Sequence, residues 1–284
     1  HVKVECGNGD VYEGNVLNGQ KQGIGEMRYR AGNCRYEGSW QNDMRHGHGV
    51  MYYATGDRWE GKWVMNERGT SGVMTYDPKN GSELKYDGQW NGLRRHGQGH
   101  LIMKRTDGTE GNGDEYTGRW ARDEKVNDYG VQVYHTGPNS RYEGSWMNSQ
   151  PSGKGKMTHR NGDVYEGQWA RGTRAGYGKL KCKDGQIYEG EWVNNERSGR
   201  GTQKFKDGAV YMGSWRNDQR QLTGVMTYGT GDPKYKKGDS FEGDWDRDKR
   251  CDGEGVERYA QVEGPTDTPQ MNCYCGKLVA IQSG

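Results

Sequence analysis

One five-residue phrase recurs along the whole chain and accounts for every tryptophan in it. The phrase is Tyr-Glu-Gly-x-Trp, and it stands at Tyr36–Trp40, Tyr142–Trp146, Tyr165–Trp169 and Tyr188–Trp192. Looser copies begin at Tyr12, Trp59, Tyr86, Tyr116, Tyr211 and Phe241. Nine of the ten tryptophans hold the last position of a copy, and Trp59 replaces the tyrosine at the first. A chain that uses its largest aromatic residue in this way builds one small unit repeatedly.

The composition is unusual for a folded chain of 284 residues. Only 30% of the residues are hydrophobic and 28% are charged, and the mean hydropathy is -1.25, values that resemble those of disordered proteins. Yet the chain has 10 tryptophans and 19 tyrosines, and each aromatic ring can bury roughly 150–250 Å². The 49 glycines follow the aromatic phrase rather than every third position, which excludes collagen. We therefore expect a thin, hydrated repeat array with an aromatic spine.

The repeat has a basic period of 23 residues and contains two patterns that are typical of strands. Within the phrase, Tyr, Gly and Trp are two residues apart and share one face of a strand. A Gly-x-Gly pair such as Gly23/Gly25 then opens a second segment, in which mostly apolar residues such as Met27 and Tyr29 are also two apart. Asn-Gly and Asp-Gly pairs turn the chain into the next repeat. Each repeat is therefore predicted to be a β-hairpin.

An isolated hairpin is marginally stable, so the repeats are expected to stack. The predicted fold is all-β: an elongated, twisted antiparallel ribbon, or solenoid, of stacked hairpins. A glycine between two rings leaves room for a ring of the neighbouring strand to lie across it. The residues expected to hold this structure are Tyr36, Gly38, Trp40, Trp63, Trp90, Trp120, Trp146, Trp169, Trp192, Trp215 and Trp245.

These phrases and Gly-x-Gly pairs resemble the MORN repeat (membrane occupation and recognition nexus). The resemblance covers about ten repeats within residues 1–259, preceded by a partial one, and leaves residues 260–284 as a non-repeat tail. Departures are local, and the largest are Val16 in place of Trp and Thr70 and Leu222 in place of the first Gly. Long arrays of this kind resemble components of the ciliary axoneme, notably radial-spoke heads, and other cytoskeletal assemblies.

The ends and the insertions depart from the regular repeat. Val2, Val4 and Cys6 fit the second strand of a preceding repeat, so we expect the sequence to begin inside a repeat of a longer protein. The apolar segment from Cys273 to Ile281 is expected to cap the last strand edge. The interval from the second Gly to the next phrase is at least ten positions and grows to 14, 17 and 17 before Tyr86, Tyr116 and Phe241. These loops share one rim, and the sequence favours tolerated solvent loops over a binding side.

No residues form a recognisable catalytic or cofactor-binding constellation. The glutamate that recurs once per repeat is better explained as a solvated strand face than as a general acid–base pair. His46 and His96 fill the same turn position, which favours turn chemistry over a metal site. The six cysteines show no Cys-x-x-Cys spacing, so we expect neither zinc nor disulfides, and a reduced cytoplasmic setting. We expect no catalytic residue, cofactor or metal.

The charge balance argues against nucleic acid as a partner. The chain has 41 basic and 39 acidic residues, a net charge of +2, whereas proteins that grip nucleic acid over a whole surface are strongly basic. Local basic clusters are candidates for contact with anionic lipid. Acidic residues interrupt most of them, which favours a solvated surface. The candidate residues are Arg94, Arg95, Lys104, Arg105, Lys234, Lys236 and Lys237.

The leading functional hypothesis is a non-enzymatic scaffold that docks other proteins. The family resemblance implies cytoskeletal or axonemal partners and a location in the cilium or flagellum. Open strand edges at the ends also permit self-association. Two alternatives stay open: a phosphoinositide or membrane-contact module, and a targeting array attached to an enzyme outside this sequence.

Overall fold

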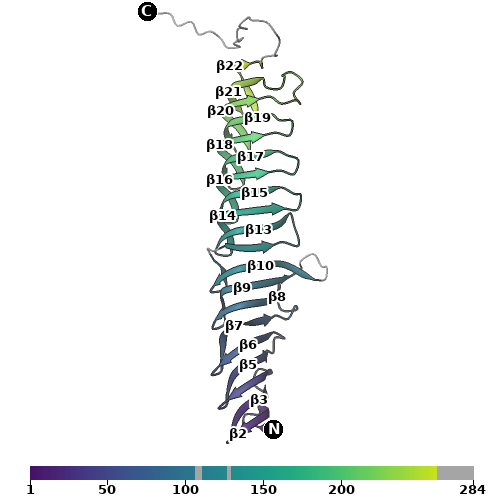
Figure 1. Ribbon diagram of the computed structural model, residues 1–284, viewed down its shortest axis with the longest axis vertical. Coiled ribbons are helices and arrows are strands. Elements are labelled where there is room, and N and C mark those ends of the chain that lie inside the picture. The colour runs from purple at the N-terminus through teal and green to yellow at the C-terminus, as the bar shows by residue number, and fades with distance from the viewer. Residues whose placement is uncertain (106–110, 127–128, 261–284) are drawn as a thin grey trace, which may run out of the picture. The chain divides into compact units, whose positions relative to one another are not determined.

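The computed structural model describes residues 1–105, 111–126 and 129–260. Contacts between Cα atoms divide the chain into two compact units, His1–Gln150 and Pro151–Gly284, here called the N-terminal and the C-terminal unit. The described residues contain strands and turns and no helix. Within each unit, successive strands pair antiparallel and lie one beyond the next (Figure 1).

The N-terminal unit contains the strands β1 to β13. Their bounds are β1 Val2–Glu5, β2 Val11–Leu17, β3 Gln20–Tyr29, β4 Cys34–Gln41, β5 Met44–Tyr52, β6 Arg58–Val64, β7 Glu67–Thr75, β8 Glu83–Asn91, β9 Arg94–Lys104, β10 Asn112–Ala121, β11 Glu124–Lys125, β12 Tyr129–Val133 and β13 Asn139–Met147.

The C-terminal unit holds β14, which begins at the boundary, to β22. Their bounds are β14 Gln150–His159, β15 Val164–Ala170, β16 Thr173–Lys181, β17 Ile187–Val193, β18 Glu196–Lys204, β19 Val210–Arg216, β20 Gln219–Thr227, β21 Ser240–Asp246 and β22 Lys249–Arg258. The prediction of an all-β antiparallel array of hairpins is confirmed for each unit. The apolar segment expected to cap the last edge, Cys273 to Ile281, lies outside the described residues.

A continuous row of glycines crosses the strands of each unit. Gly38 of the phrase in β4 is the Cα partner of Gly25 in β3 on one side and of Gly49 in β5 on the other. The same pairing repeats in the C-terminal unit, where Gly190 lies between Gly178 and Gly201. From Gly38 on, phrase glycines are thus matched to the second glycine of the Gly-x-Gly pair before them and after them, whereas Gly14 has Val2 as its partner in β1. The sequence spacing of the two patterns sets the register of the sheet.

Bulges bend the strands beside this glycine row. The pairing between β4 and β5 shifts between Gly38 and Trp40, and equivalent shifts recur in most hairpins. The first glycine of the Gly-x-Gly pair takes a left-handed backbone conformation at Gly23, Gly47, Gly97, Gly153, Gly176 and Gly199, with φ of 87° at Gly47. Glycine adopts this conformation without steric cost. A bulge increases local twist and bends the strand, so the aromatic side chains of one sheet face are brought against one another.

Leu222 occupies this left-handed position in the ninth repeat, with φ of 54°. Left-handed backbone costs a non-glycine residue about 1–2 kcal/mol, and the Leu222 side chain is 67% exposed, so no burial compensates. We predict that Leu222→Gly raises the free energy of unfolding by about 1 kcal/mol, measured by chemical denaturation. Thr223→Gly, at the next position with ordinary backbone, should lower it by about 0.5–1 kcal/mol. If both changes destabilise equally, the backbone at Leu222 carries no strain.

The tight turns inside the hairpins link neighbouring repeats. Asn42 and Asp43 between β4 and β5 both have positive φ, 50° and 65°, the conformation of type I′ hairpin turns. The Asp43 side chain accepts a hydrogen bond from the backbone N–H of Lys21 in the preceding repeat (2.9 Å), and the Asp43 N–H donates to the Lys21 carbonyl (3.2 Å). Asp218 holds Arg197 in the same way. These hydrogen bonds join the turn of one hairpin to the strand that follows the turn of the preceding hairpin.

Candidate functional site

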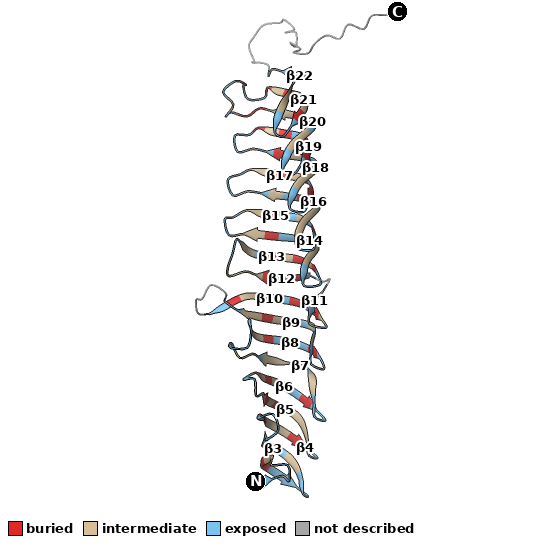
Figure 2. Cartoon of the chain, turned by 180° about the vertical axis from the view of Figure 1, so that it is seen from behind, coloured by how far each residue is buried: buried red, intermediate tan, exposed pale blue. Residues whose placement is uncertain are grey.

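The rings of the repeated phrase pack against one another in the core of each unit. In Figure 2, buried residues recur on strand after strand and exposed residues flank them. Tyr188 is 2% exposed and contacts Trp192 of its own phrase and Trp215 of the next, both edge to face, with ring centroids 5.1 and 5.4 Å apart. Tyr36 and Tyr211 make the same two contacts. These ring contacts join neighbouring repeats. Where Trp59 replaces the tyrosine, Arg68 lies over both Trp59 (5.2 Å) and Trp90 (5.8 Å).

Every polar atom of these rings has a fixed partner in the regular repeats. The Tyr188 hydroxyl donates to the carbonyl of Glu191, three residues on (3.0 Å). The Trp192 Nε1–H donates to the carbonyl of Gly178, the second glycine of the preceding Gly-x-Gly pair (3.1 Å). Both bonds recur along the chain. A buried donor without a partner lowers the stability of the fold. The tyrosine hydroxyl and the tryptophan N–H reach different carbonyl groups, so each position of the phrase favours its own residue type.

The tyrosine ring lies over two glycines of the row. A Cβ atom built on Gly49 would lie 2.2 Å from the Tyr36 hydroxyl, and one on Gly38 would lie 2.6 Å from it. Gly38 belongs to the strand that carries Tyr36, and Gly49 belongs to the neighbouring strand. The expectation that a neighbouring strand's ring covers the phrase glycine is therefore corrected, because the covering ring comes from the same strand.

A basic side chain covers each ring row at a position that sequence reasoning missed. Arg174 lies over Trp192 (4.2 Å), Arg197 over Trp215 (4.3 Å) and Arg220 over Trp245 (4.4 Å), measured from the guanidinium carbon to the ring centroid. The signal is readable in the sequence, since a basic residue stands five positions after the last phrase position in nine of the ten repeats. These residues are Lys21, Arg45, Arg68, Arg95, Lys125, Arg174, Arg197, Arg220 and Arg250, and Pro151 is the exception. Cation–π contact and shielding of the rings are their evident role.

The ionisation of these core groups follows from their burial. Burial raises the pKa of Tyr36 to about 12, and the nearby Arg45 opposes that shift. Burial lowers the pKa of the Lys125 ammonium to about 8, and the positive charge of Arg95 acts in the same direction. Lys125 still lies between the rings of Tyr116 and Trp146, at 4.4 and 4.7 Å. The groups with the largest shifts thus belong to the packing of the array.

The insertion before Phe241 folds back onto the end of the C-terminal unit. Tyr235 of this loop is 9% exposed and stacks on Tyr228 with ring centroids 4.0 Å apart. Its hydroxyl donates to Glu257 (2.7 Å), and Arg250 donates to both Glu257 (2.6 Å) and the Tyr235 hydroxyl (2.5 Å). The sequence favoured a tolerated solvent loop here. That expectation is wrong for this loop, because its tyrosine completes a buried polar cluster.

The hydrogen bonds of Glu257 make the free energy of unfolding depend on pH in the acidic range. Hydrogen bonds from Tyr235, Arg250 and Tyr259 lower the pKa of Glu257 to about 2 from its ordinary 4.5. A lowered pKa contributes stability that is present above the ordinary value and is lost as the pH falls through the folded value. We predict that wild type is more stable than Glu257→Gln at pH 7 and that the difference narrows between pH 4.5 and 2. Denaturation of both proteins at several pH values measures it, and a constant difference would contradict the prediction.

The basic residues proposed as surface contacts do not form one patch. Arg94 is exposed at the start of β9, and Lys104 is exposed at its end, roughly 30 Å away along an extended strand. Arg95 has a side chain only 13% exposed, and it pairs with Glu83 (2.8 Å) and Asp123 (3.3 Å) beneath the exposed surface. It is therefore held within the array.

The remaining basic candidates have partners close by. Arg105 is partly buried and makes contacts of its own. Lys234, Lys236 and Lys237 are exposed in the loop before Phe241. The backbone N–H groups of Lys234 and Lys236 donate to the carboxylates of Asp232 and Asp239. Acidic side chains thus lie beside these lysines, as the sequence indicates.

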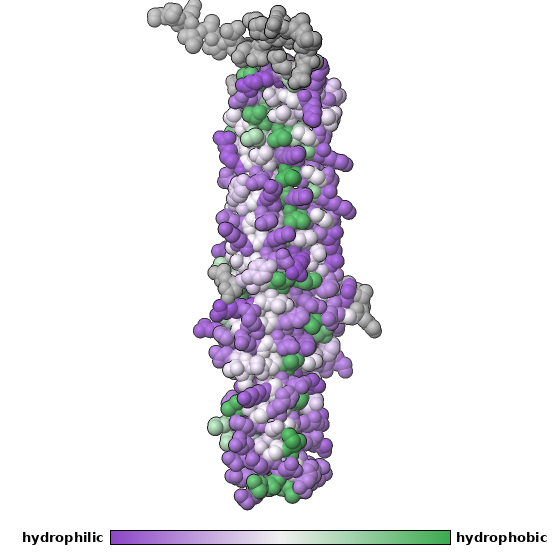
Figure 3. Space-filling view, in the orientation of Figure 1, coloured by the Kyte–Doolittle hydropathy of each residue, from purple (hydrophilic) through white to green (hydrophobic). Residues whose placement is uncertain are grey.

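The sheet face opposite the rings, here called the outer face, carries charges of alternating sign on β14 to β17. Lys156, Glu166, Lys179 and Glu189 are successive cross-strand partners on β14 to β17. Lys179 pairs with Glu189 at 3.0 Å. Figure 3 shows a mainly hydrophilic surface on which hydrophobic residues form small separate patches. Opposite charges on adjacent strands stabilise the sheet modestly and leave little net charge for an anionic partner.

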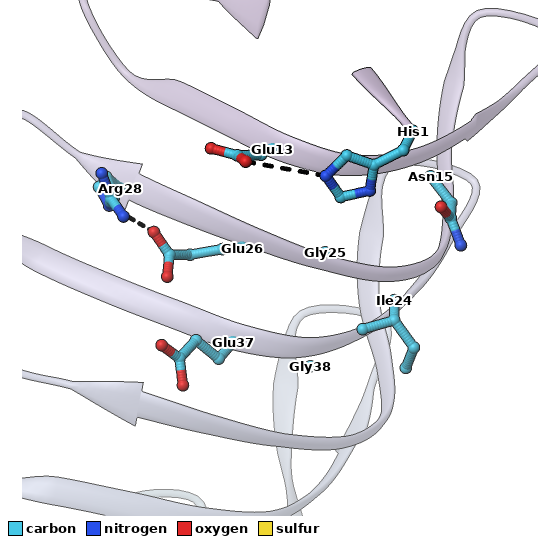
Figure 4. Close-up of a pocket in the computed structure, with 9 residues that line it drawn as sticks. All are labelled: His1, Glu13, Asn15, Ile24, Gly25, Glu26, Arg28, Glu37 and Gly38. Carbon is cyan, nitrogen blue, oxygen red and sulfur yellow. Dashed lines mark ion pairs between the residues drawn. The ribbon is translucent and has the colours of Figure 1, made fainter. Parts of the chain in front are cut away.

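A shallow depression of about 450 Å³ lies on the outer face of β2 to β4. Figure 4 shows the carboxylates of Glu13, Glu26 and Glu37 from three adjacent strands along it, with Ile24 at its side. Arg35 pairs with both Glu26 (3.1 Å) and Glu37, so these carboxylates are engaged in ion pairs. This arrangement is that of a charged strand surface.

The middle residue of Gly-x-Gly is exposed and differs from repeat to repeat. It holds Ile24, His48, Ser71, Gln98 and Tyr129 in the N-terminal unit, and Lys154, Tyr177, Arg200 and Thr223 in the C-terminal unit, all of them exposed. A second set of exposed apolar residues lies at the tight turns, where Met65 and Leu93 are 64% and 75% exposed. Sequence reasoning points to the basic clusters and the strand edges at the ends, and it missed both of these exposed sets.

Within residues 1–105, 111–126 and 129–260, no group of three or more His, Cys, Asp or Glu side chains is placed to hold a metal ion. In the same residues no helix has the length and apolarity to span a membrane.

Comparison with known families identifies the repeat. The family model described as the MORN repeat matches residues 12–34, 36–58, 86–103, 142–164, 165–187, 188–210, 211–232 and 241–261. No individual curated protein matches the chain. The repeats that begin at Trp59 and Tyr116 fall outside these matches, yet Trp59, Trp63, Tyr116 and Trp120 are as buried as their counterparts. The chain belongs to the MORN-repeat family, whose arrays serve protein interaction or membrane binding.

Proposed function

We propose that this protein is a non-enzymatic scaffold whose repeats present docking positions to other proteins. One observation carries the proposal: the frame of rings, glycines and cations is nearly constant, whereas the exposed middle residue of Gly-x-Gly changes from repeat to repeat. Ile24, Tyr129 and Tyr177 are 65%, 65% and 56% exposed at this position. Repeat arrays present such variable residues along an extended binding surface.

We further propose that the partners belong to the cytoskeleton, and in particular to the axoneme of a cilium or flagellum. The support is the length of the array in this sequence, which the sequence resemblance associates with components of the axoneme. The alternating charges of β14 to β17 and the glutamates of β2 to β4 on the outer face favour a protein partner over an anionic lipid. Lipid binding gains about 1 kcal/mol for each unopposed basic residue near the surface.

Fractionation of ciliated cells tests the proposal. The tagged full chain is expected to stay with the detergent-resistant cytoskeleton. A triple variant, Ile24→Ser, Tyr129→Ser and Tyr177→Ser, should be released. A matched control that removes three apolar residues exposed at the tight turns, Leu17, Leu93 and Val193, should be retained. Complete extraction of the wild type by gentle detergent would refute a cytoskeletal role.

Vesicle flotation tests the membrane alternative. The purified chain is mixed at physiological salt with neutral vesicles and with vesicles that contain phosphatidylserine and phosphoinositide. The scaffold proposal expects no flotation with either kind. Flotation with the anionic vesicles, lost in Lys234→Ala, Lys236→Ala and Lys237→Ala, would favour a membrane-contact module instead.

A further inference from the structure

A second column of the outer face runs beside the alternating charges of the C-terminal unit. It passes through the residue that precedes the phrase, which is Val164 in β15, Ile187 in β17 and Val210 in β19. Lys181 in β16 is the cross-strand partner of Val164 and Ile187, and Lys204 in β18 is that of Ile187 and Val210. These five residues are here called the lysine column. The lysines are exposed and the aliphatic residues are half-buried, so the two kinds of side chain alternate from strand to strand.

The two lysines of this column have no acidic partner. In the N-terminal unit the basic residues of the same column all lie within ion-pair distance of a carboxylate; they are Arg28, Arg35, Arg58, Lys85 and Arg141. Arg258 in β22 likewise pairs with Glu242 (2.9 Å). Among the described residues, neither Lys181 nor Lys204 forms an ion pair. Their charges are therefore available to a partner.

The sequence around the lysine column explains why its charges are unpaired. The glutamate of the strict phrase is replaced in β19 by Met212, which is 58% exposed and has two uncharged cross-strand partners. No carboxylate therefore stands on that side of Lys204. Next to Lys181 the glutamate is present, but Glu189 pairs with Lys179 (3.0 Å). The outer face around Lys204 thus carries unpaired lysines, aliphatic side chains and an exposed methionine instead of ion pairs.

This combination favours a protein segment that is both acidic and apolar. An unpaired ammonium group attracts a carboxylate, and a half-buried aliphatic side chain gains from apolar contact. A lipid surface offers the negative charge as well. It would meet the ammonium groups at the ends of the longer lysine side chains and leave Ile187 and Val210 between them uncovered. A protein segment can reach both kinds of side chain.

The spacing of the lysine column matches an α-helix that lies across the strands. Adjacent strands are about 4.8 Å apart, so Lys181 and Lys204, two strands apart, are separated by about 9.6 Å. Seven residues of an α-helix rise roughly 10.5 Å. A carboxylate at every seventh position would meet successive lysines, and an apolar residue three or four positions on would meet Ile187. An extended strand in the same direction repeats one face every 6.8 Å or so, about 2.8 Å short of the lysine spacing.

We propose that the lysine column binds an acidic, amphipathic α-helix of a partner protein. The helix lies across β15 to β19, with carboxylates at Lys181 and Lys204 and an apolar side chain between them over Ile187. Met212 adds an exposed apolar contact beside the helix. This assignment rests on the proposed scaffold function, because it names the chemistry of one partner that the C-terminal unit docks.

Binding of a synthetic peptide to the purified full chain tests the helix and its period. The probe is a fluorescent peptide of three heptads, with Glu at the first and Leu at the fourth position of each heptad and Ala and Gln elsewhere. The comparison peptide has the same composition with Glu and Leu on different helix faces. In fluorescence anisotropy, the first peptide should bind at least about tenfold more tightly, and its affinity should fall as salt rises. Equal affinity of the two peptides, or no saturable binding up to about 1 mM peptide, overturns the proposal.

Charge reversal locates the site. Lys181→Glu with Lys204→Glu should weaken binding at least about tenfold, and a peptide with Lys in place of Glu should bind this variant and not wild type. Met212→Glu restores the phrase glutamate beside Lys204 and should weaken binding about threefold. The matched control is Arg216→Glu with Lys249→Glu, the same change of net charge at exposed positions beside the tight turns, and it should bind as wild type does. Equal weakening by the control shows general electrostatic attraction and overturns the assignment.

Vesicles separate a lipid from a protein as the source of negative charge. Vesicles of phosphatidylcholine and phosphatidylserine should not displace the peptide from wild type at physiological salt. Vesicle binding that is lost in Lys181→Glu with Lys204→Glu would assign the column to a membrane and overturn the helix. Failure of the peptide to bind, while wild type stays with the cytoskeleton, overturns this assignment and leaves the scaffold proposal standing. Peptide binding with complete extraction of the wild type overturns the cytoskeletal role alone.

Discussion

Replacement of Trp192 by alanine is expected to lower the free energy of unfolding by about 3–5 kcal/mol, the range for removal of a buried tryptophan. Trp192 is 2% exposed and lies between Tyr165 and Tyr188, with ring centroids 5.3 and 5.1 Å away. Its removal opens a cavity between two repeats. It also exposes the carbonyl of Gly178 and leaves Arg174 without the ring that it covers. Chemical denaturation measures the loss.

Two further variants separate these contributions. Trp192→Phe keeps a ring but removes the N–H donor to Gly178, so the expected loss is only about 1–2 kcal/mol. Val193→Ala alters the next residue, which is 56% exposed, and should change stability by less than about 0.5 kcal/mol. A loss below 1 kcal/mol for Trp192→Ala would show that the rings do not carry the stability of the array.

The strands and their pairing could be predicted because two sequence patterns in each repeat together fix the register of the sheet. Tyr, Gly and Trp two residues apart define one strand face, and the distance to Gly-x-Gly fixes which glycines meet. Gly178, Gly190 and Gly201 are paired as that spacing requires. Ten repetitions of one pattern remove the ambiguity that a single short segment would have.

The basic residues that lie over the tryptophan rings were missed in the sequence for a physical reason. A lysine or arginine five positions after the tryptophan resembles any solvated charge in a sequence with 28% charged residues. Only the bent hairpin shows that Arg197 reaches Trp215 of the next repeat. Arg95 was grouped with Arg94 as a surface cluster, but adjacent strand residues point to opposite faces. That alternation places Arg95 over Trp120 and leaves Arg94 exposed.

A periodic sequence pattern cannot predict a contact that only one repeat makes. The bond from Tyr235 to Glu257 joins an insertion to β22, and no other repeat shows an equivalent bond among the residues that the structure describes. The hydrogen bond that is lost where Trp59 replaces the tyrosine of the phrase likewise becomes visible only in the folded structure. Trp59 is fully buried, and its Nε1 is the single buried side-chain nitrogen or oxygen without a partner in the described residues.

Gly99→Ala is expected to lower the free energy of unfolding by about 3 kcal/mol, although it adds only one methyl group. A Cβ atom at Gly99 would lie 2.2 Å from the Tyr86 hydroxyl and 2.4 Å from its ring carbon Cζ. Tyr86 cannot move aside, because it is fully buried between Trp90 and Trp120, at 5.0 and 5.5 Å. Gly81→Ala is the matched control, since a Cβ there meets no atom within 4 Å; it should be neutral or slightly stabilising.

A double-mutant cycle assigns the cost of Gly99→Ala to the ring. Tyr86→Ala alone should cost about 3–5 kcal/mol through loss of the buried side chain. Once the ring is gone, the methyl group at residue 99 has space, so the double variant should be more stable than the sum of the single losses predicts by at least about 1 kcal/mol. Strict additivity would mean that the backbone, and not Tyr86, demands glycine. The glycine row would then serve the bend of the strands, and the tyrosine position would tolerate any large apolar residue.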